Sequence, residues 1–154
     1  MTRPLVVSLV LAAVLSPQAA PAAAGKDKAP RVTARVAVDP SPARPGEPVR
    51  ISVRLEPPEG VTLNRYPGIT LKIDHVEGLD VASREVFVGT RKPVTDVEKF
   101  AFEKVPPLVV EGVAGAGSRR GLIRGELKYF YCVKKSGFCA PASRPLEITV
   151  PIGG

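Results

Sequence analysis

Alternating apolar and polar residues, separated by clusters of proline and glycine, recur along most of this 154-residue chain. An apolar residue at every second position lets one face of a β-strand pack on a core while the other face meets solvent. Proline fixes the backbone φ angle and lacks an N–H donor, so 17 prolines leave little room for a helix longer than two turns. The chain therefore predicts strands and no convincing helix. The runs cover residues 32–38, 49–55, 69–73, 79–88, 100–110, 123–133 and 146–152.

This spacing of strands predicts an all-β fold, an immunoglobulin-like antiparallel β-sandwich. A small closed barrel is the alternative. Proline and glycine break the chain at residues 40–46 and 57–60, and a glycine-rich loop is expected over residues 111–121. We expect residues 25–154 to form a single stand-alone domain and a monomer, with residues 25–31 as a short lead-in.

The first 24 residues have the order of a secretory signal peptide. Arg3 provides the positive charge, residues 5–15 form an apolar run, and a stretch of small residues ends at Ala24. The apolar run is shorter than the about 20 residues that cross a bilayer, and no later segment reaches that length. We therefore expect cleavage after Ala24, a periplasmic location and no membrane span in the mature chain. An uncleaved anchor is the alternative.

Charge and composition argue against several classes of function. The formal net charge is +7, but no basic-aromatic recognition motif for nucleic acid is present. The basic residues are expected to form a solvated surface, or to attract an acidic protein partner or anionic envelope components. One histidine and two cysteines cannot fill an ordinary four-ligand zinc site without a carboxylate. No nucleotide, phosphate or hydrolase motif is present, so no cofactor and no metal are expected.

The residues best suited to carry chemistry lie together in residues 129–141, Tyr-Phe-Tyr-Cys-Val-Lys-Lys-Ser-Gly-Phe-Cys-Ala-Pro. This segment holds both cysteines, Cys132 and Cys139, and four of the eight aromatic residues. Ser136 and Gly137 are turn formers, so the segment is predicted to form a hairpin that can bring the two Cβ atoms to bonding distance. In an oxidising compartment, two thiols placed in this way usually pair.

Two interpretations of the cysteine pair remain open at this point. As a structural staple, a disulfide that closes a loop of about eight residues would add roughly 2.5 kcal/mol of stability. As a redox pair, the cysteines would exchange electrons with a partner, which needs an accessible sulfur and a fraction of thiolate. Lys134 and Lys135 would favour a thiolate if they point toward it. The side chains of Tyr129, Tyr131 and Phe138 would then form a partly apolar surround.

The same segment resembles the cysteine hairpin of the amino-terminal periplasmic domain of the thiol:disulfide interchange protein DsbD. The matching residues are Tyr129-Phe-Tyr-Cys132, then Gly137-Phe-Cys139, and then Pro141. The strand at 146–150 and the segment 46–49 also resemble parts of that domain. The resemblance implies an immunoglobulin-like sandwich that exchanges electrons with a thioredoxin-like or membrane redox partner without a cofactor, as in cytochrome c biogenesis.

The resemblance also implies roles for individual residues. Cys139 would form the mixed disulfide with the partner, and Cys132 would resolve it. A short cap loop would cover the pair, with Phe87 as the candidate cap residue and Glu85 as a nearby acid. The chain is thus a candidate thiol:disulfide oxidoreductase. The alternative is a non-catalytic binding or assembly β-sandwich with a structural disulfide.

Two further features are His75 and the segment 64–68. His75 lies between Asp74 and Glu77 and would be a metal ligand with these acids or with the cysteines, although a lone histidine beside acids is more often a surface residue. Residues 64–68, Asn-Arg-Tyr-Pro-Gly, form a loop that either borders the cysteine site or serves only as a turn.

Overall fold

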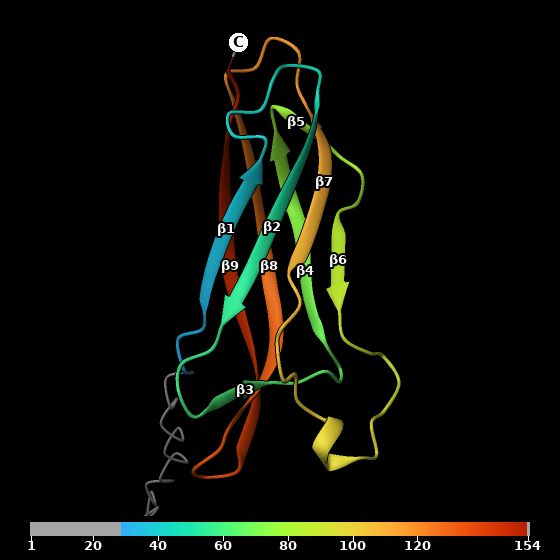
Figure 1. The fold of residues 1–154 in the computed structure, drawn as a ribbon, viewed down its shortest axis with the longest axis vertical. Coiled ribbons are helices and arrows are strands. Elements are labelled where there is room, and N and C mark those ends of the chain that lie inside the picture. The colour runs from blue at the N-terminus through green and yellow to red at the C-terminus, as the bar shows by residue number, and fades with distance from the viewer. Residues whose placement is uncertain (1–28, 154) are drawn as a thin grey trace, which may run out of the picture.

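The structure is a computed structural model that describes residues 29–153, and it consists of two antiparallel sheets packed face to face (Figure 1). The sheets do not close into a barrel, so the prediction of an immunoglobulin-like sandwich is confirmed. The first sheet has the order β1-β2-β7-β5, with bounds Thr33–Asp39, Pro48–Glu56, Leu108–Ala114 and Leu79–Val81.

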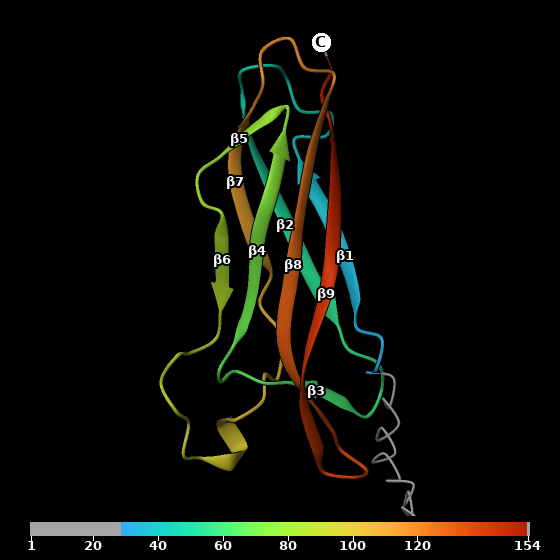
Figure 2. The same ribbon diagram turned by 180° about the vertical axis from the view of Figure 1, so that it is seen from behind.

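The second sheet is built around the long strand β8 (Figure 2). One edge of β8 pairs with β9, and the other edge pairs with β4 and with the short strand β3, while β6 pairs with β4. The bounds of these strands are β3 Val61–Leu63, β4 Ile69–Glu77, β6 Glu85–Val88, β8 Arg120–Val133 and β9 Phe138–Pro151.

The core is almost entirely aliphatic and lies between the two sheets. The predicted alternation sends every second side chain of β2 and β8 inward, and the buried residues of β4 and β9 face them. Tyr129 and Tyr131 are the buried aromatic residues of the cluster. The other fully buried side chains include Ile51, Val53, Leu63, Ile69, Leu71, Leu108, Val110, Ile123 and Val150.

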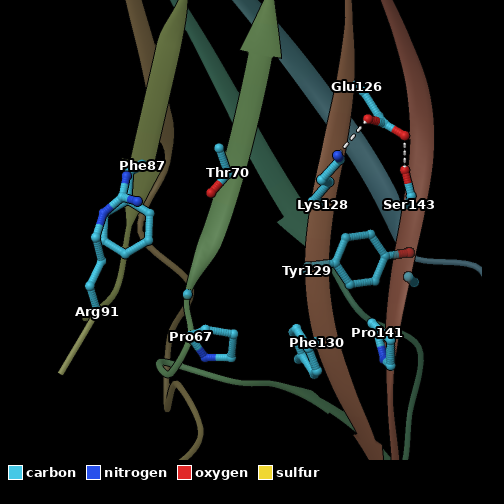
Figure 3. A pocket seen from close by; sticks show the side chains of 12 residues that line it. Pro67, Thr70, Phe87, Arg91, Glu126, Lys128, Tyr129, Phe130, Pro141 and Ser143 are labelled. Atoms are coloured by element: carbon cyan, nitrogen blue, oxygen red, sulfur yellow. Dashed lines mark hydrogen bonds and ion pairs between the residues drawn. The ribbon is translucent and has the colours of Figure 1, made fainter. Parts of the chain in front are cut away.

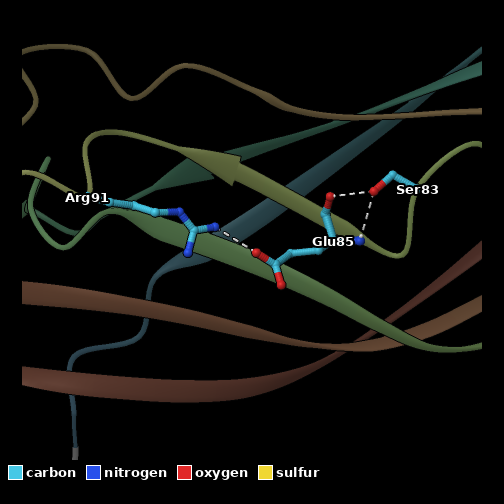
Figure 4. A network of polar contacts seen from close by, with 3 residues as sticks. All are labelled: Ser83, Glu85 and Arg91. Carbon is cyan, nitrogen blue, oxygen red and sulfur yellow. Dashed lines mark hydrogen bonds and ion pairs between the residues drawn. The ribbon is translucent and has the colours of Figure 1, made fainter.

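The predicted strand over residues 79–88 is wrong in one respect, because the chain changes sheets within it. Residues 79–81 form β5 and pair with β7, whereas residues 85–88 form β6 and pair with β4. Ser83 makes the local turn: its Oγ accepts a hydrogen bond from the Glu85 N–H at 3.1 Å, and its hydroxyl donates to the Glu85 carbonyl (Figure 4). Such serine turns replace ladder hydrogen bonds and allow the chain to leave a sheet.

The predictions over residues 100–121 also need correction. Strand β7 begins only at Leu108, directly after Pro106 and Pro107, since proline cannot donate to the ladder. It then continues to Ala114, so the expected loop over 111–121 shrinks to residues 115–119. Gly112 permits this extension: a Cβ at Gly112 would lie 2.5 Å from the Asp80 carbonyl oxygen of β5.

Strand β4 extends four residues beyond the predicted end at Ile73. The register against β8 shifts between Ile73 and His75, which is a β-bulge that interrupts the alternation read from the sequence. Strand β9 runs without a break over Phe138–Pro151, so the second arm of the predicted hairpin and the run predicted over residues 146–152 form one strand; β3 was not predicted. A single 3-10 turn, η1 (Val97–Lys99), lies between β6 and β7.

The proposed signal peptide, residues 1–24, lies outside the described residues, and its cleavage stays a prediction. Within residues 29–153, no helix has the length and apolar character needed to cross a membrane.

Candidate functional site

The cysteine pair lies at one end of the sandwich, where β8 and β9 extend past the first sheet as a two-stranded hairpin (Figure 1). Cys132 and Cys139 are direct partners in the β8–β9 register and form a disulfide, with their Cα atoms 4.0 Å apart. The predicted hairpin and disulfide are therefore confirmed. The loop of residues 134–137 closes with Gly137 at φ 69°, a left-handed conformation that glycine adopts without strain.

Prolines of β9 set the hydrogen-bonding pattern around the disulfide. Pro141 lies opposite Phe130 and Pro145 lies opposite Glu126. Proline has no N–H, so these must be pairs that do not hydrogen-bond to each other. In an antiparallel pair of strands, such pairs alternate with hydrogen-bonded ones. Cys132 and Cys139 lie two residues beyond Phe130 and Pro141, so they also form a non-hydrogen-bonded pair, the kind with the shorter Cα–Cα distance. The prolines also remove two donors from the free edge of β9, which makes that edge a poor template for pairing with another chain.

The two sulfur atoms lie in different surroundings. Cys139 is exposed, whereas Cys132 is half-buried. Cys132 Sγ lies 3.4 Å from Asn64 Oδ1, and Cys139 Sγ lies 3.8 Å from the carbonyl oxygen of Gly137. Both neighbours are oxygen atoms, and a disulfide sulfur carries no hydrogen to donate to them. A thiolate of a partner protein would therefore reach the Cys139 sulfur more readily than the Cys132 sulfur.

Asn64 is held beside Cys132 by backbone pairing from two directions. Its N–H donates to the carbonyl of Phe130 in β8 at 3.0 Å, and it forms an isolated bridge with Ala101 on the other side. The Arg65 N–H donates to the Phe100 carbonyl at 2.8 Å, which continues the same pairing. The segment 100–102 thus covers Asn64, whose side chain is only 2% exposed.

The predicted aromatic surround lies mostly on the core side of the sheet. Tyr129 and Tyr131 are buried and point inward, while the side chain of Cys132 points to the outer face. Phe138 packs edge-to-face on Tyr131, with ring centroids 6.4 Å apart, and is 53% exposed at the end of the sandwich. These rings lie on the core face of the hairpin and do not shield the sulfurs, which are on the outer face.

Phe87, the candidate cap residue, lies away from the disulfide. In the sheet register it pairs with Thr70, which pairs with Lys128, four residues before Cys132. At about 3.4 Å per residue, that row lies about 14 Å from the cysteines along the strand. The guanidinium of Arg91 stacks on the Phe87 ring, 4.4 Å from its centroid.

Glu85 pairs with this same arginine. Arg91 Nη2 donates to Glu85 Oε1 at 2.7 Å, so the predicted acid belongs to the Phe87 cluster and not to the cysteine pair (Figure 4). The structure therefore does not bring Phe87 or Glu85 over the sulfurs.

Phe87 instead lines a groove of about 610 Å³ on the outer face of the second sheet (Figure 3). Phe130 and Pro141 line the end of the groove nearest the disulfide, since they form the next outward-facing pair after Cys132 and Cys139. The lining comprises Pro67, Gly68, Thr70, Phe87, Arg91, Glu126, Lys128, Tyr129, Phe130, Pro141, Ala142 and Ser143.

Glu126 carries the negative charge of this groove. It accepts a hydrogen bond from the Ser143 hydroxyl and lies 3.0 Å from Lys128 Nζ (Figure 3). These contacts, the serine hydrogen bond first, hold the pKa of Glu126 below its usual value. The pKa of the Tyr129 phenol is shifted in the other direction, because burial raises it.

His75 does not approach the cysteines. It pairs with Arg124 of β8, eight residues before Cys132, which corresponds to about 27 Å along the strand. Its Nε2 lies 3.9 Å from Glu77 Oε2 on an exposed surface. Among residues 29–153, no group of three or more His, Cys, Asp or Glu side chains is arranged to hold a metal ion.

Known proteins share little sequence with this chain. No protein-family model matches the sequence, and no curated protein shows significant sequence similarity to it. A solved structure with a similar arrangement is the cohesin module of a family 33 glycoside hydrolase from Clostridium perfringens, with a TM-score of 0.45 and 10% sequence identity. The match covers 79% of this chain and 98% of that module.

Sequence reasoning did not single out Asn64 as a neighbour of sulfur. Its segment, 64–68, was expected either to border the site or to form a plain turn, and the structure places Asn64 at the site. The contact depends on pairing of residues 63–65 with both β8 and residues 100–102, which are distant in sequence. The one usable signal is a polar residue directly after the short alternating segment Val61-Thr62-Leu63.

Proposed function

We propose that this protein is an exported thiol–disulfide exchange module that passes electrons through Cys132 and Cys139 to or from a partner protein. The observation that carries the proposal is the disulfide at the exposed end of a hairpin, with one sulfur accessible and the other half-buried. This asymmetry suits exchange, in which one thiol attacks the partner and the other resolves the intermediate. The resemblance of the hairpin to that of the DsbD amino-terminal domain supports the same role.

In the reduced module, Cys139 loses its proton and its thiolate attacks one sulfur of a partner disulfide. A Cys139–partner disulfide forms, and the second partner sulfur leaves as a thiolate. Cys132 then loses its proton and attacks the Cys139 sulfur, which re-forms the internal disulfide and releases the first partner sulfur. Two electrons have passed to the partner, whose thiolates take up two protons. Electrons enter the module by the reverse sequence.

The partner is expected to be a thioredoxin-like protein or a membrane redox protein, as the hairpin resemblance implies. Lys134 and Lys135 are exposed in the hairpin loop and would favour thiolate formation and an acidic partner surface. Export rests on the amino-terminal sequence pattern, and an oxidising compartment is where such a pair would cycle.

The reduction potential of the pair tests the proposal. The oxidised protein is equilibrated with a series of glutathione ratios, and the reduced fraction is measured by thiol alkylation and mass spectrometry. Exchange chemistry predicts a potential above about −300 mV, within reach of cellular thiol systems. A potential well below that value would identify a bond that resists reduction and would reject the proposal.

A second candidate is a non-catalytic binding or assembly module with a stapled hairpin. The groove beside Phe87 and Phe130 favours it, because it offers apolar and charged side chains on an exposed sheet face. This candidate predicts that the Cys132→Ala/Cys139→Ala double variant loses stability but keeps its partner. Loss of partner binding at unchanged stability would count against it.

A further inference from the structure

Asn64 is an unusual residue at this site because it is the one buried polar or charged residue of the described chain, at 2% exposure. Burying a side-chain amide is unfavourable unless its oxygen and nitrogen find hydrogen-bonding partners. The backbone N–H of Asn64 donates to the Phe130 carbonyl, whereas the side-chain Oδ1 faces Cys132 Sγ at 3.4 Å.

The value of this contact depends on the oxidation state of the sulfur. In the disulfide, Cys132 Sγ has no hydrogen, so Oδ1 accepts nothing from it. After reduction, the thiol S–H can donate to the same oxygen without movement of the backbone. A buried acceptor without a donor costs free energy, so the amide is better satisfied in the reduced state than in the oxidised state.

We propose that Asn64 is a positioning residue that stabilises the reduced form of Cys132 and thereby raises the reduction potential of the Cys132–Cys139 pair. The inference rests on the proposed exchange function. It also assigns different tasks to the two thiols. Asn64 holds Cys132 in place as the resolving thiol, while Cys139, which is exposed and has the Gly137 carbonyl near its sulfur, remains free to meet the partner.

The test compares the wild-type protein with Asn64→Ala in glutathione buffers. In the reaction, the protein disulfide and two glutathione thiols give two protein thiols and one oxidised glutathione. Loss of one hydrogen bond in the reduced form should lower the equilibrium constant for reduction by roughly threefold to tenfold. A tenfold change corresponds to about 30 mV for this two-electron couple.

Leu63→Ala is the matched control. Leu63 is the preceding residue and is similarly buried, at 1% exposure, but it pairs with Tyr131 and its side chain belongs to the core cluster, on the opposite face of the sheet from Cys132. It should lower stability without changing the equilibrium constant. A change of the same size in both variants would mean that general loosening of the segment, and not the amide, sets the potential, which would overturn the inference.

A measurement on the wild-type protein keeps the inference testable if Asn64→Ala does not fold. The side-chain amide resonances of Asn64 in an NMR spectrum should shift on reduction of the disulfide, since a new hydrogen bond forms. Unchanged resonances, or an unchanged potential in Asn64→Ala, would overturn the role of Asn64 while the exchange function stands. A wild-type potential well below about −300 mV would instead reject the exchange function itself.

Discussion

Removal of the disulfide by the double variant Cys132→Ala/Cys139→Ala should destabilise the domain without unfolding it. The bond closes a loop of about eight residues, and the chain-entropy relation gives about 2.5 kcal/mol for a loop of that size. The sequence separation of the cysteines is 7. The buried cluster includes Tyr131, with Val133 and Ala140 packed against it, but neither cysteine belongs to it, so we expect the core contacts to survive loss of the bond.

Urea unfolding followed by circular dichroism measures the effect. With a slope of 1 to 3 kcal/mol per molar urea, a loss of about 2.5 kcal/mol should lower the midpoint by roughly 0.8 to 2.5 M. The wild-type protein reduced with excess dithiothreitol is the control and should show a similar loss. Failure to fold, or a loss above about 5 kcal/mol, would show that the fold depends on the bond. That result would refute the argument that the pair is free for exchange.

Three further perturbations test other parts of the account. Leu71→Ala should lower the free energy of unfolding by about 2 to 5 kcal/mol, since Leu71 is 1% exposed, whereas Val97→Ala, at an 87% exposed position, should change it by less than about 0.5 kcal/mol. Gly125→Ala should be more destabilising than Gly117→Ala. A Cβ at Gly125 would lie 2.3 Å from the Lys72 carbonyl oxygen, whereas a Cβ at Gly117 would meet nothing within 4 Å, so that only the φ of 83° at Gly117 opposes a side chain. Equal losses of stability in urea unfolding would contradict this. Because the pKa of Glu126 is lowered in the folded state, its contribution to stability is present above the unfolded-state pKa and is lost as pH falls through the folded-state pKa. Ser143→Ala should raise the Glu126 pKa toward its usual value in an NMR titration, and an unchanged midpoint would show that the serine does not hold the carboxylate.

The alternation of apolar residues was enough to predict most of the sandwich. It located β1, β2 and β8 closely, because each of these strands runs without interruption along one sheet. It could not reveal the sheet change between β5 and β6, since the pattern continues through residues 79–88 while Ser83 turns the chain. It also ended β4 too early, because a bulge shifts the inward face at Asp74.

The site was only partly predictable for a related reason. Cys132 and Cys139 are neighbours in sequence as well as in space, so a hairpin pattern sufficed to pair them. Phe87 was assigned by resemblance alone, and the β4–β6 register places it in the groove with Arg91 instead of over the sulfurs. Asn64 reaches Cys132 through contacts between segments distant in sequence, which no local pattern encodes.

Formation of a mixed disulfide at one defined sulfur tests the central claim most directly. Cys132→Ala and Cys139→Ala each leave a single thiol, and each variant is mixed with a disulfide-bonded thioredoxin-fold protein and with oxidised glutathione. The account predicts that Cys132→Ala, which keeps the exposed Cys139, forms mixed disulfides much faster than Cys139→Ala. Equal and slow reaction of both variants, or faster reaction through Cys132, would contradict it.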